Sequence, residues 1–158
     1  MRKPLLSGER LFKSYGFSHH AIRGVEIELY EGEAVVLLGE SGCGKSTLAR
    51  ILCGLESPDA GEVHRSSSLP FLGVQMLFQD PFSALNPRRT VEESVGEALP
   101  RGERTPRVAA LLGEVGIEAH RGEEYPGSFS GGQLQRINLA RALSVDPRVL
   151  VLDEPVSS

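Results

Sequence analysis

The feature that most constrains this chain is a glycine-rich segment that directly follows an apolar run. Residues 34–38, Ala-Val-Val-Leu-Leu, have no polar interruption, which is typical of a strand covered on both faces. They lead into residues 39–47, Gly-Glu-Ser-Gly-Cys-Gly-Lys-Ser-Thr, which match the pattern G-x-x-x-x-G-K-[ST]. Helix formers continue from Ser46 to Leu52, and Gly54 is a suitable helix end. The order of strand, loop and helix predicts an α/β fold built around a phosphate site.

The glycines, the lysine and the hydroxyl residues of this loop suit an anion and its metal ion. Glycines let the backbone wrap closely and turn its N–H groups inward, and the following helix adds its positive end. The pattern places Lys45 to reach the β- and γ-phosphates and Ser46 to hold Mg²⁺. The alternative is a merely flexible loop. We therefore predict that ATP and Mg²⁺ bind here, on Gly39, Glu40, Ser41, Gly42, Cys43, Gly44, Lys45, Ser46 and Thr47.

A second apolar run ends in two carboxylates. Residues 149–152, Val-Leu-Val-Leu, predict a fully buried strand that delivers Asp153 and Glu154 at its C-terminal edge, where ligands sit in open α/β sheets. In P-loop ATPases the strand-end aspartate completes the Mg²⁺ shell, which assigns that role to Asp153. Glu154 is then placed to orient or activate the attacking water. The alternative for this pair is an ordinary solvated strand end.

Another short segment combines a helix start with bare backbone. Ser130 and Gln133 have the S-x-x-Q spacing of a capping box, and Gly131 and Gly132 lie between them. Two glycines in a first turn are poor for helix stability, yet they leave the helix N-terminus open to a phosphate. The choice is between a well-capped helix alone and a second anion site on Ser130, Gly131, Gly132 and Gln133.

Charge and hydropathy limit the possible partners. The chain carries 17 basic and 21 acidic residues, a net charge of −4, so we expect no nucleic acid partner. Its two cysteines fit a reducing compartment and form no disulfide framework. The longest apolar runs have the length of strands, so we expect a chain that is soluble by itself and reaches a membrane only through a partner.

The composition of the sequence changes between residues 81 and 127. Prolines punctuate short helical stretches there, and Thr105-Pro106 is a good helix start with a capping hydroxyl. We interpret residues 81–127 as a helical subdomain inserted in a P-loop ATPase core that comprises residues 1–80 and 128–158. Alternation over residues 25–30 predicts a half-exposed strand, and residues 74–78 predict another.

Residues 129–133, Phe-Ser-Gly-Gly-Gln, resemble the LSGGQ signature of ATP-binding cassette (ABC) proteins, with Phe in place of the usual Leu. Together with the glycine loop and residues 149–154, the resemblance covers nearly the whole chain. It implies an ABC-type nucleotide-binding domain of the P-loop NTPase fold, with an N-terminal antiparallel β subdomain and an inserted helical subdomain. Gln79 looks like the family's Q-loop glutamine. The resemblance implies that Gln79 contacts Mg²⁺ and that Gln79, Glu154 and Lys45 are the catalytic residues. Tyr15, 24 residues before Gly39, lies where the family places an aromatic that stacks on adenine.

The resemblance is sharpest to one branch of the family. Residues 79–88, Gln-Asp-Pro-Phe-Ser-Ala-Leu-Asn-Pro-Arg, are similar to the ATPase subunits of dipeptide, oligopeptide and nickel importers, and residues 44–50, 54–58 and 133–136 lean towards nickel. In that family two ATPase subunits, identical or different, face each other head to tail, with ATP between the P-loop of one and the signature of the other. The helical region contacts membrane permease subunits. The resemblance therefore implies a peripheral protein on the cytoplasmic face of the inner or plasma membrane.

The chain departs from the family where the sequence given ends, at Ser158. The family continues with the D-loop and a strand that ends in a switch histidine, whereas all four histidines here precede the signature. We therefore expect an incomplete sheet, retained ATP binding and poor hydrolysis. Two alternatives are a soluble ABC ATPase of DNA repair or translation, and an ATP-binding fragment without catalysis. The compact stretch between Gln79 and Ser130 argues against the first.

Overall fold

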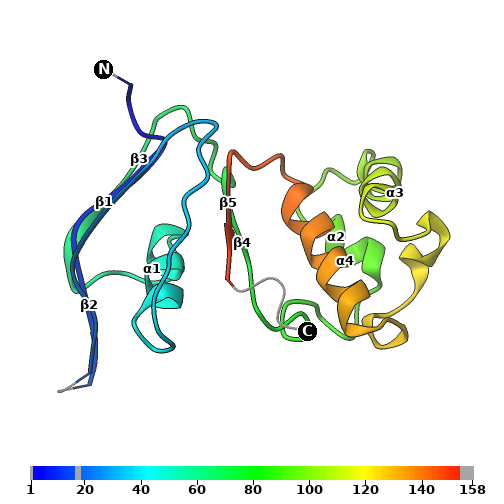
Figure 1. Ribbon diagram of the computed structural model, residues 1–158. Helices are drawn as coiled ribbons and strands as arrows, with labels where there is room; N and C mark the ends of the chain where they lie inside the picture. The colour runs from blue at the N-terminus through cyan, green and yellow to red at the C-terminus, as the bar shows by residue number, and fades with distance from the viewer. Residues whose placement is uncertain (1, 17–18, 154–158) are drawn as a thin grey trace. The chain divides into compact units, whose positions relative to one another are not determined.

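The computed structural model describes residues 2–16 and 19–153, and the chain divides into two compact units, Met1–Val74 and Gln75–Ser158 (Figure 1). The elements in chain order are β1 (Leu6–Tyr15), β2 (His19–Leu29), α1 (Lys45–Leu52), β3 (Ala60–Arg65), β4 (Val74–Leu77), α2 (Val91–Val95), α3 (Arg104–Glu114), the 3₁₀ helices η1 (Ala119–Glu123) and η2 (Pro126–Ser128), α4 (Gly131–Leu143) and β5 (Val149–Leu152). The finer division at residues 80 and 127 stays a prediction.

The first unit contains the predicted N-terminal antiparallel subdomain. Strands β2, β1 and β3 lie in that order, and Leu6 on β1 pairs with Leu29 on one side and Arg65 on the other. From Val25 to Leu29, half-buried and exposed residues alternate, which confirms the predicted half-exposed strand. Helix α1 packs against β1 and β2, and Leu11 of β1 is fully buried.

The apolar run before the glycine loop does not form the strand that the sequence predicts. Residues 34–38 are assigned no strand, and they lie on the surface, with Val36 75% and Leu38 89% exposed. A buried strand needs partner strands for its N–H and C=O groups, and among the residues that the structure describes none forms a strand beside this run. Without such partners, a sequence of high strand propensity stays extended and open to solvent.

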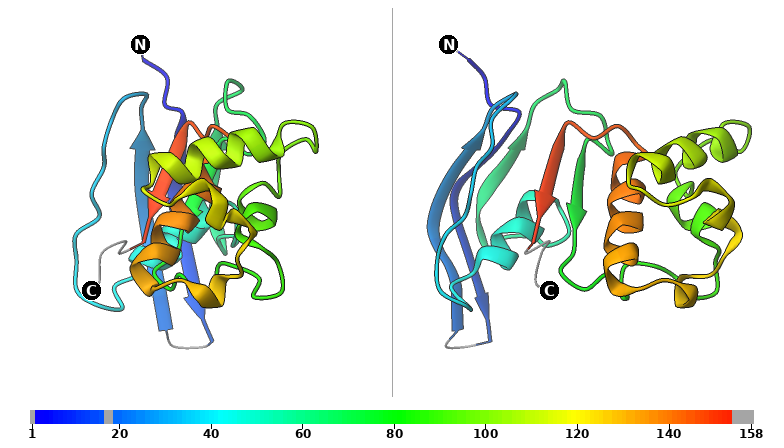
Figure 2. Two further views of the ribbon diagram at one scale, coloured as in Figure 1. Left: turned by 90° about the vertical axis from the view of Figure 1, so that its right-hand side faces the viewer. Right: turned by 45° about the vertical axis from the view of Figure 1, so that its right-hand side comes forward.

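A second, two-stranded sheet combines β4 and β5, which run side by side in the same direction (Figures 1 and 2). Both strands were predicted, and both form. The prediction that β5 is fully buried is wrong, because only Val149 is buried and Leu152 is 50% exposed. Within the described part of the chain each strand has one neighbour, so the faces of this sheet stay partly open.

The helices of the second unit share one apolar core, to which both the region 81–127 and helix α4 contribute. Its buried members are Leu85, Val91, Val95, Val108, Leu111, Leu112, Ile117, Phe129, Leu134, Ile137 and Ala140. Helix α3 begins at Arg104, so the predicted cap at Thr105 is wrong: the Thr105 hydroxyl donates to Oε1 of Glu92 at 2.6 Å instead. A contact between helices has replaced the local cap. No helix in the described ranges is both long and apolar enough to span a bilayer.

Candidate nucleotide-binding site

The glycine loop folds around the amine of its own lysine. Lys45 Nζ donates to the main-chain oxygens of Gly39 and Glu40, both at 2.9 Å, and lies 3.9 Å from the Sγ atom of Cys43. The N–H of Cys43 donates back to the oxygen of Glu40 at 3.3 Å, which closes the turn. The loop therefore has a positive charge inside its concave side, where an anion is attracted.

Two glycines of the loop adopt backbone conformations that other residues rarely take. Gly42 has φ +79° and Gly44, the residue before α1, has φ +99°. A Cβ atom on Gly44 would overlap the carbonyl oxygen of Ala21 on β2, whereas one on Gly42 would meet nothing within 4 Å. Gly44 lets the loop pass against β2, and Gly42 leaves open space on the outer side of the loop.

Helix α1 presents its N-terminus to this loop. Its first turn contains no acidic residue, and its first N–H groups have no partners within the helix. At the other end, Gly54 N–H donates to the oxygen of Ile51 at 3.0 Å and Leu55 N–H to that of Arg50 at 2.9 Å, a Schellman motif that confirms the predicted end of the helix. The bare backbone, the lysine and the helix N-terminus together fit a phosphate group.

A cavity of about 380 Å³ adjoins the loop within the first unit. It is lined by residues 20–23 and Val25 of β2, by Leu37 and Leu38 of the apolar run, and by Cys43, Gly44 and Lys45 of the loop. Its volume lies in the range of small-molecule sites, which are about 300–1,000 Å³. Its walls are mainly apolar and carry the cationic side chains of Arg23 and Lys45, which suits a ligand that has both an uncharged part and an anionic part.

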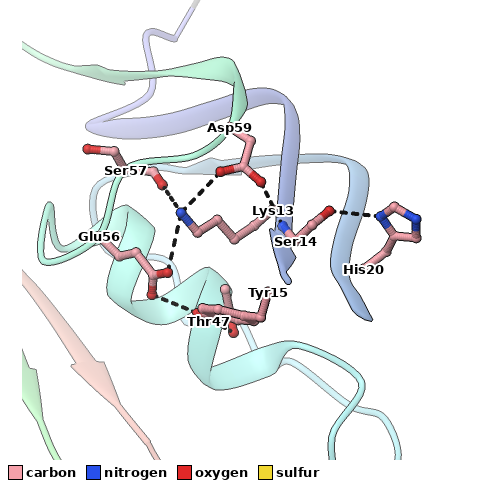
Figure 3. A network of polar contacts seen from close by, with 8 residues as sticks. All are labelled: Lys13, Ser14, Tyr15, His20, Thr47, Glu56, Ser57 and Asp59. Carbon is pink, nitrogen blue, oxygen red and sulfur yellow. Dashed lines mark hydrogen bonds and ion pairs between the residues drawn. The ribbon is translucent and has the colours of Figure 1, made fainter. Parts of the chain in front are cut away.

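Tyr15, the predicted adenine contact, lies next to the end of the glycine loop (Figure 3). Its hydroxyl is 3.3 Å from Oγ1 of Thr47 and donates to Oε2 of Glu56 at 2.8 Å. The residue as a whole is 42% exposed. The structure thus brings this residue to the loop across 32 positions of sequence, while its stacking role stays a prediction.

The residues that hold Tyr15 were missed at the sequence level. Lys13 Nζ lies 3.5 Å from Oε1 of Glu56 and 3.2 Å from Oδ1 of Asp59, and the second oxygen of Asp59 accepts from the N–H of Ser14 at 2.8 Å. The hydrogen bond from Ser14 and then that from Lys13 hold the pKa of Asp59 below its ordinary value. In turn, the hydrogen bond to Asp59 raises the pKa of Lys13. No motif in the sequence indicates a contact of Tyr15 with residues 56–59.

In the second unit, the predicted capping box at the start of α4 is confirmed. Gln133 N–H donates to Oγ of Ser130 at 3.4 Å, and Ser130 N–H donates to Oε1 of Gln133 at 2.9 Å. A Cβ atom on Gly132 would meet nothing within 4 Å, and one on Gly131 only a Phe82 ring carbon at 3.9 Å. The first turn of α4 therefore offers bare backbone to solvent, while the side chain of Gln133 is held by the cap.

Gln79 and Asp153 follow neighbouring strands. Gln79 is exposed and comes two residues after β4, and the half-buried Asp153 follows β5, with its N–H donating to the oxygen of Leu77 at 3.1 Å. Because β4 and β5 are parallel, the two residues share one edge of this sheet. Glu154, the predicted catalytic carboxylate, lies outside the described residues.

Helix α4 also holds the segment that follows Gln79. Asn138 Nδ2 donates to the oxygen of Pro81 at 2.9 Å, and Arg141 Nη1 donates to that of Ala84 at 3.0 Å. Arg141 Nη2 reaches Glu97 at 3.1 Å. Each main-chain contact spans 57 positions, so nothing in the local sequence pattern could have predicted it.

These features define a nucleotide-binding protein of the P-loop class, and comparison with known proteins identifies the family. The sequence model described as ABC transporter matches residues 22–157, and the chain belongs to this family. It is 42% identical over 90% of its length to a protein of Shigella boydii serotype 4 (strain Sb227) named "Nickel import ATP-binding protein NikE". It is 44% identical, again over 90% of its length, to the protein of that name from Escherichia coli O157:H7. The predicted resemblance to ABC importer ATPases is thereby confirmed.

Solved structures agree with the assignment. The chain is 30% identical, with a TM-score of 0.78, to cbiO1 of Clostridium perfringens, described as part of the ABC transporter complex cbiONQ, and the match covers 97% of this chain and 66% of that one. It is 28% identical, with a TM-score of 0.82, to the ATP-binding cassette MJ0796 in a dimeric structure bound to ADP and Pi, covering 96% and 75%. The chain spans 62–65% of the length of the two nickel-import relatives above.

Proposed function

We propose that this chain is the ATP-binding part of an ABC importer ATPase subunit, and that ATP hydrolysis energises uptake of nickel or peptides. The observation that carries the proposal is the amine of Lys45, held 2.9 Å from two main-chain oxygens inside a glycine loop at a helix N-terminus. Phosphate oxygens are better partners for an ammonium than neutral carbonyls are. Lys45 exchanges its two carbonyls for the β- and γ-phosphates when ATP enters the loop.

The proposal extends to Mg²⁺ and to hydrolysis. Ser46, Gln79 and Asp153 offer a hydroxyl, an amide oxygen and a carboxylate, the hard oxygen ligands that Mg²⁺ prefers, so the donor set fits this ion. When bound, Mg²⁺ neutralises charge on the phosphate oxygens. Glu154 orients or activates the attacking water, and Lys45 stabilises the negative charge that develops on the transferred group.

We also propose that a second ATPase subunit, identical or different, completes the site. The support is the start of α4, where Ser130 caps the helix and the backbone of Gly131 and Gly132 is open to solvent. The MJ0796 relative is described as dimeric, and cbiO1 as part of a transporter complex. We assign membrane permease subunits to the helical region 81–127, which places the chain at the cytoplasmic face of a membrane. The net charge of −4 supports no nucleic acid role.

A pair of lysine variants tests ATP binding. We expect Lys45→Ala to weaken ATP binding by at least about tenfold in calorimetric titration, because a hydrogen bond to a charged group is worth about 1.5–3 kcal/mol. Lys3→Ala, an exposed lysine outside the loop, is the matched control and should bind ATP as the parent chain does. Equal affinity in the two variants would contradict the assignment of the loop.

The cargo is tested in cells of the source organism. Disruption of the gene that encodes this chain should lower the uptake of radiolabelled nickel if the cargo is that of the named relatives. A loss of oligopeptide uptake with intact nickel uptake would assign peptides. If neither uptake changes, the importer proposal is wrong, and the soluble ATPase of DNA repair or translation becomes the better hypothesis.

A further inference from the structure

We propose that Glu56 is a positioning residue for the nucleotide base: anchored by Lys13, its carboxylate holds the ring of Tyr15 in the orientation on which adenine stacks. The inference rests on the proposed function, and it adds a residue to which the sequence assigned no role in binding. It predicts that Glu56 affects ligands that carry a base and leaves ligands without one unaffected. Figure 3 shows the group, which lies entirely within the first unit.

The first step is the hydrogen bonding of the Tyr15 hydroxyl. A phenol has one proton to donate, and the 2.8 Å contact with Glu56 Oε2 takes it, because a carboxylate only accepts. The 3.3 Å contact with Thr47 is therefore donated by the threonine hydroxyl. Thr47 is buried, at 7% exposure, and is the last residue of the glycine loop. The tip of the ring is thus held at two points, one of them on the phosphate loop itself.

The second step is the anchoring of Glu56. Its other oxygen lies 3.5 Å from Lys13 Nζ, and these two side chains are only 21% and 16% exposed. Lys13 is fixed in turn, because its amine also donates to the oxygen of Ser57 at 2.8 Å and to Oδ1 of Asp59 at 3.2 Å. Lys13, itself fixed by these two partners, therefore restricts the Glu56 carboxylate to the place where it meets Tyr15.

The bonded hydroxyl affects affinity through the position of the ring. Tyr15 stays 42% exposed as a residue although its hydroxyl is bonded, so the constraint fixes the side chain without burying it. Lys13 Nζ lies over the ring at 6.0 Å from its centroid, which adds a further restraint on its plane. A ring that is ordered before the ligand arrives loses less rotamer freedom on binding. The benefit applies only to a ligand that stacks on the ring.

The competing explanation is that Glu56 and Lys13 form an ion pair that only stabilises the fold. Two ligands separate the two explanations, because inorganic tripolyphosphate occupies the loop without a base. For Glu56→Ala we expect ATP affinity to fall about two- to tenfold, which is the loss that ordering one side chain causes. Tripolyphosphate affinity should stay within about twofold of the parent. The matched control is Glu26→Ala, an exposed glutamate of β2.

Two further variants complete the test, all by calorimetric titration of the same chain. Tyr15→Phe keeps the ring and removes the hydroxyl, so it should reproduce the ATP defect of Glu56→Ala, and the double variant should be no worse than either single one. Equal losses for ATP and tripolyphosphate, additive losses, or an unchanged ATP affinity would each overturn the positioning role. A parent chain that binds neither ligand would instead refute the proposed function.

Discussion

Replacement of Gly44 by alanine should destabilise the first unit far more than the same change at Gly42. Both glycines belong to the phosphate loop, and both have positive φ, +99° and +79°. They differ in their surroundings, since a Cβ atom on Gly44 would overlap the carbonyl oxygen of Ala21, well inside the 3.0 Å that real Cβ atoms respect. One on Gly42 has nothing within 4 Å. The pair therefore separates backbone strain from steric overlap.

The magnitudes follow from these two terms. A left-handed conformation costs a non-glycine residue about 1–2 kcal/mol, and the stiffer unfolded chain returns about 0.4–1 kcal/mol, so Gly42→Ala should lower the free energy of unfolding by about 1 kcal/mol. At Gly44 the overlap adds about 1–3 kcal/mol, because main-chain atoms of β2 must move. Gly44→Ala should therefore be about 2–4 kcal/mol less stable than the parent chain.

Urea unfolding followed by circular dichroism measures this difference. With slopes of about 1–3 kcal/mol per molar for small proteins, the unfolding midpoint of Gly44→Ala should lie about 1 M below that of Gly42→Ala. Equal midpoints would refute the reasoning, since they would mean that the loop does not press against β2. A changed slope would mean instead that the two-state comparison fails.

Three further predictions concern other parts of the chain. Iodoacetamide at pH 8 should label the exposed Cys43 at least about tenfold faster than Cys53, because burial raises the pKa of Cys53 to about 11 and leaves little thiolate; peptide mass spectrometry measures the two rates. Asp59→Asn should reduce the loss of stability that the chain shows at acid pH. The Ser14 N–H lowers the folded-state pKa of Asp59, so the carboxylate stabilises the fold above its unfolded pKa of about 3.9, and this stabilisation is lost as pH falls through the lower folded-state pKa. Leu134→Ala should lower the free energy of unfolding by about 2–5 kcal/mol in urea titration, since this side chain is 0% exposed in the helical core.

Each of these has a clear contrary outcome. Labelling of both cysteines at equal rates would mean that the end of α1 opens readily. An unchanged acid limb in Asp59→Asn would mean that its contacts are as weak as those of ordinary surface carboxylates. A loss below about 1 kcal/mol in Leu134→Ala would mean that the core of the second unit collapses around the missing side chain.

The parts of the fold that the sequence predicted are those with local determinants. The Schellman end of α1 at Gly54 and the capping box of Ser130 and Gln133 each depend on residues within a few positions, and both are confirmed. The run 34–38 failed because a strand needs partners that lie elsewhere in the sequence. The cap at Thr105 failed because a contact with Glu92, 13 positions away, replaced it.

The candidate site shows the same difference between local determinants and partners that are distant in sequence. The loop of residues 39–47 was predicted from its pattern, since the residue types needed to surround a phosphate are contiguous. The contact of Tyr15 with Glu56 joins positions 41 apart, and that of Asn138 with Pro81 joins positions 57 apart. No periodicity or motif records such pairs, because the strand and helix geometry that brings them together exists only in the folded chain.

The exposed apolar run has a consequence for how the isolated chain behaves in solution. Residues 34–38 combine high strand propensity with no charge and no proline, the composition of segments that pair between molecules. Glu31 and Glu33 precede the run and Glu40 follows it, so neighbouring copies that align it would bring like charges together. The three carboxylates act as gatekeepers against association. The chain should therefore aggregate more readily as added salt screens these charges.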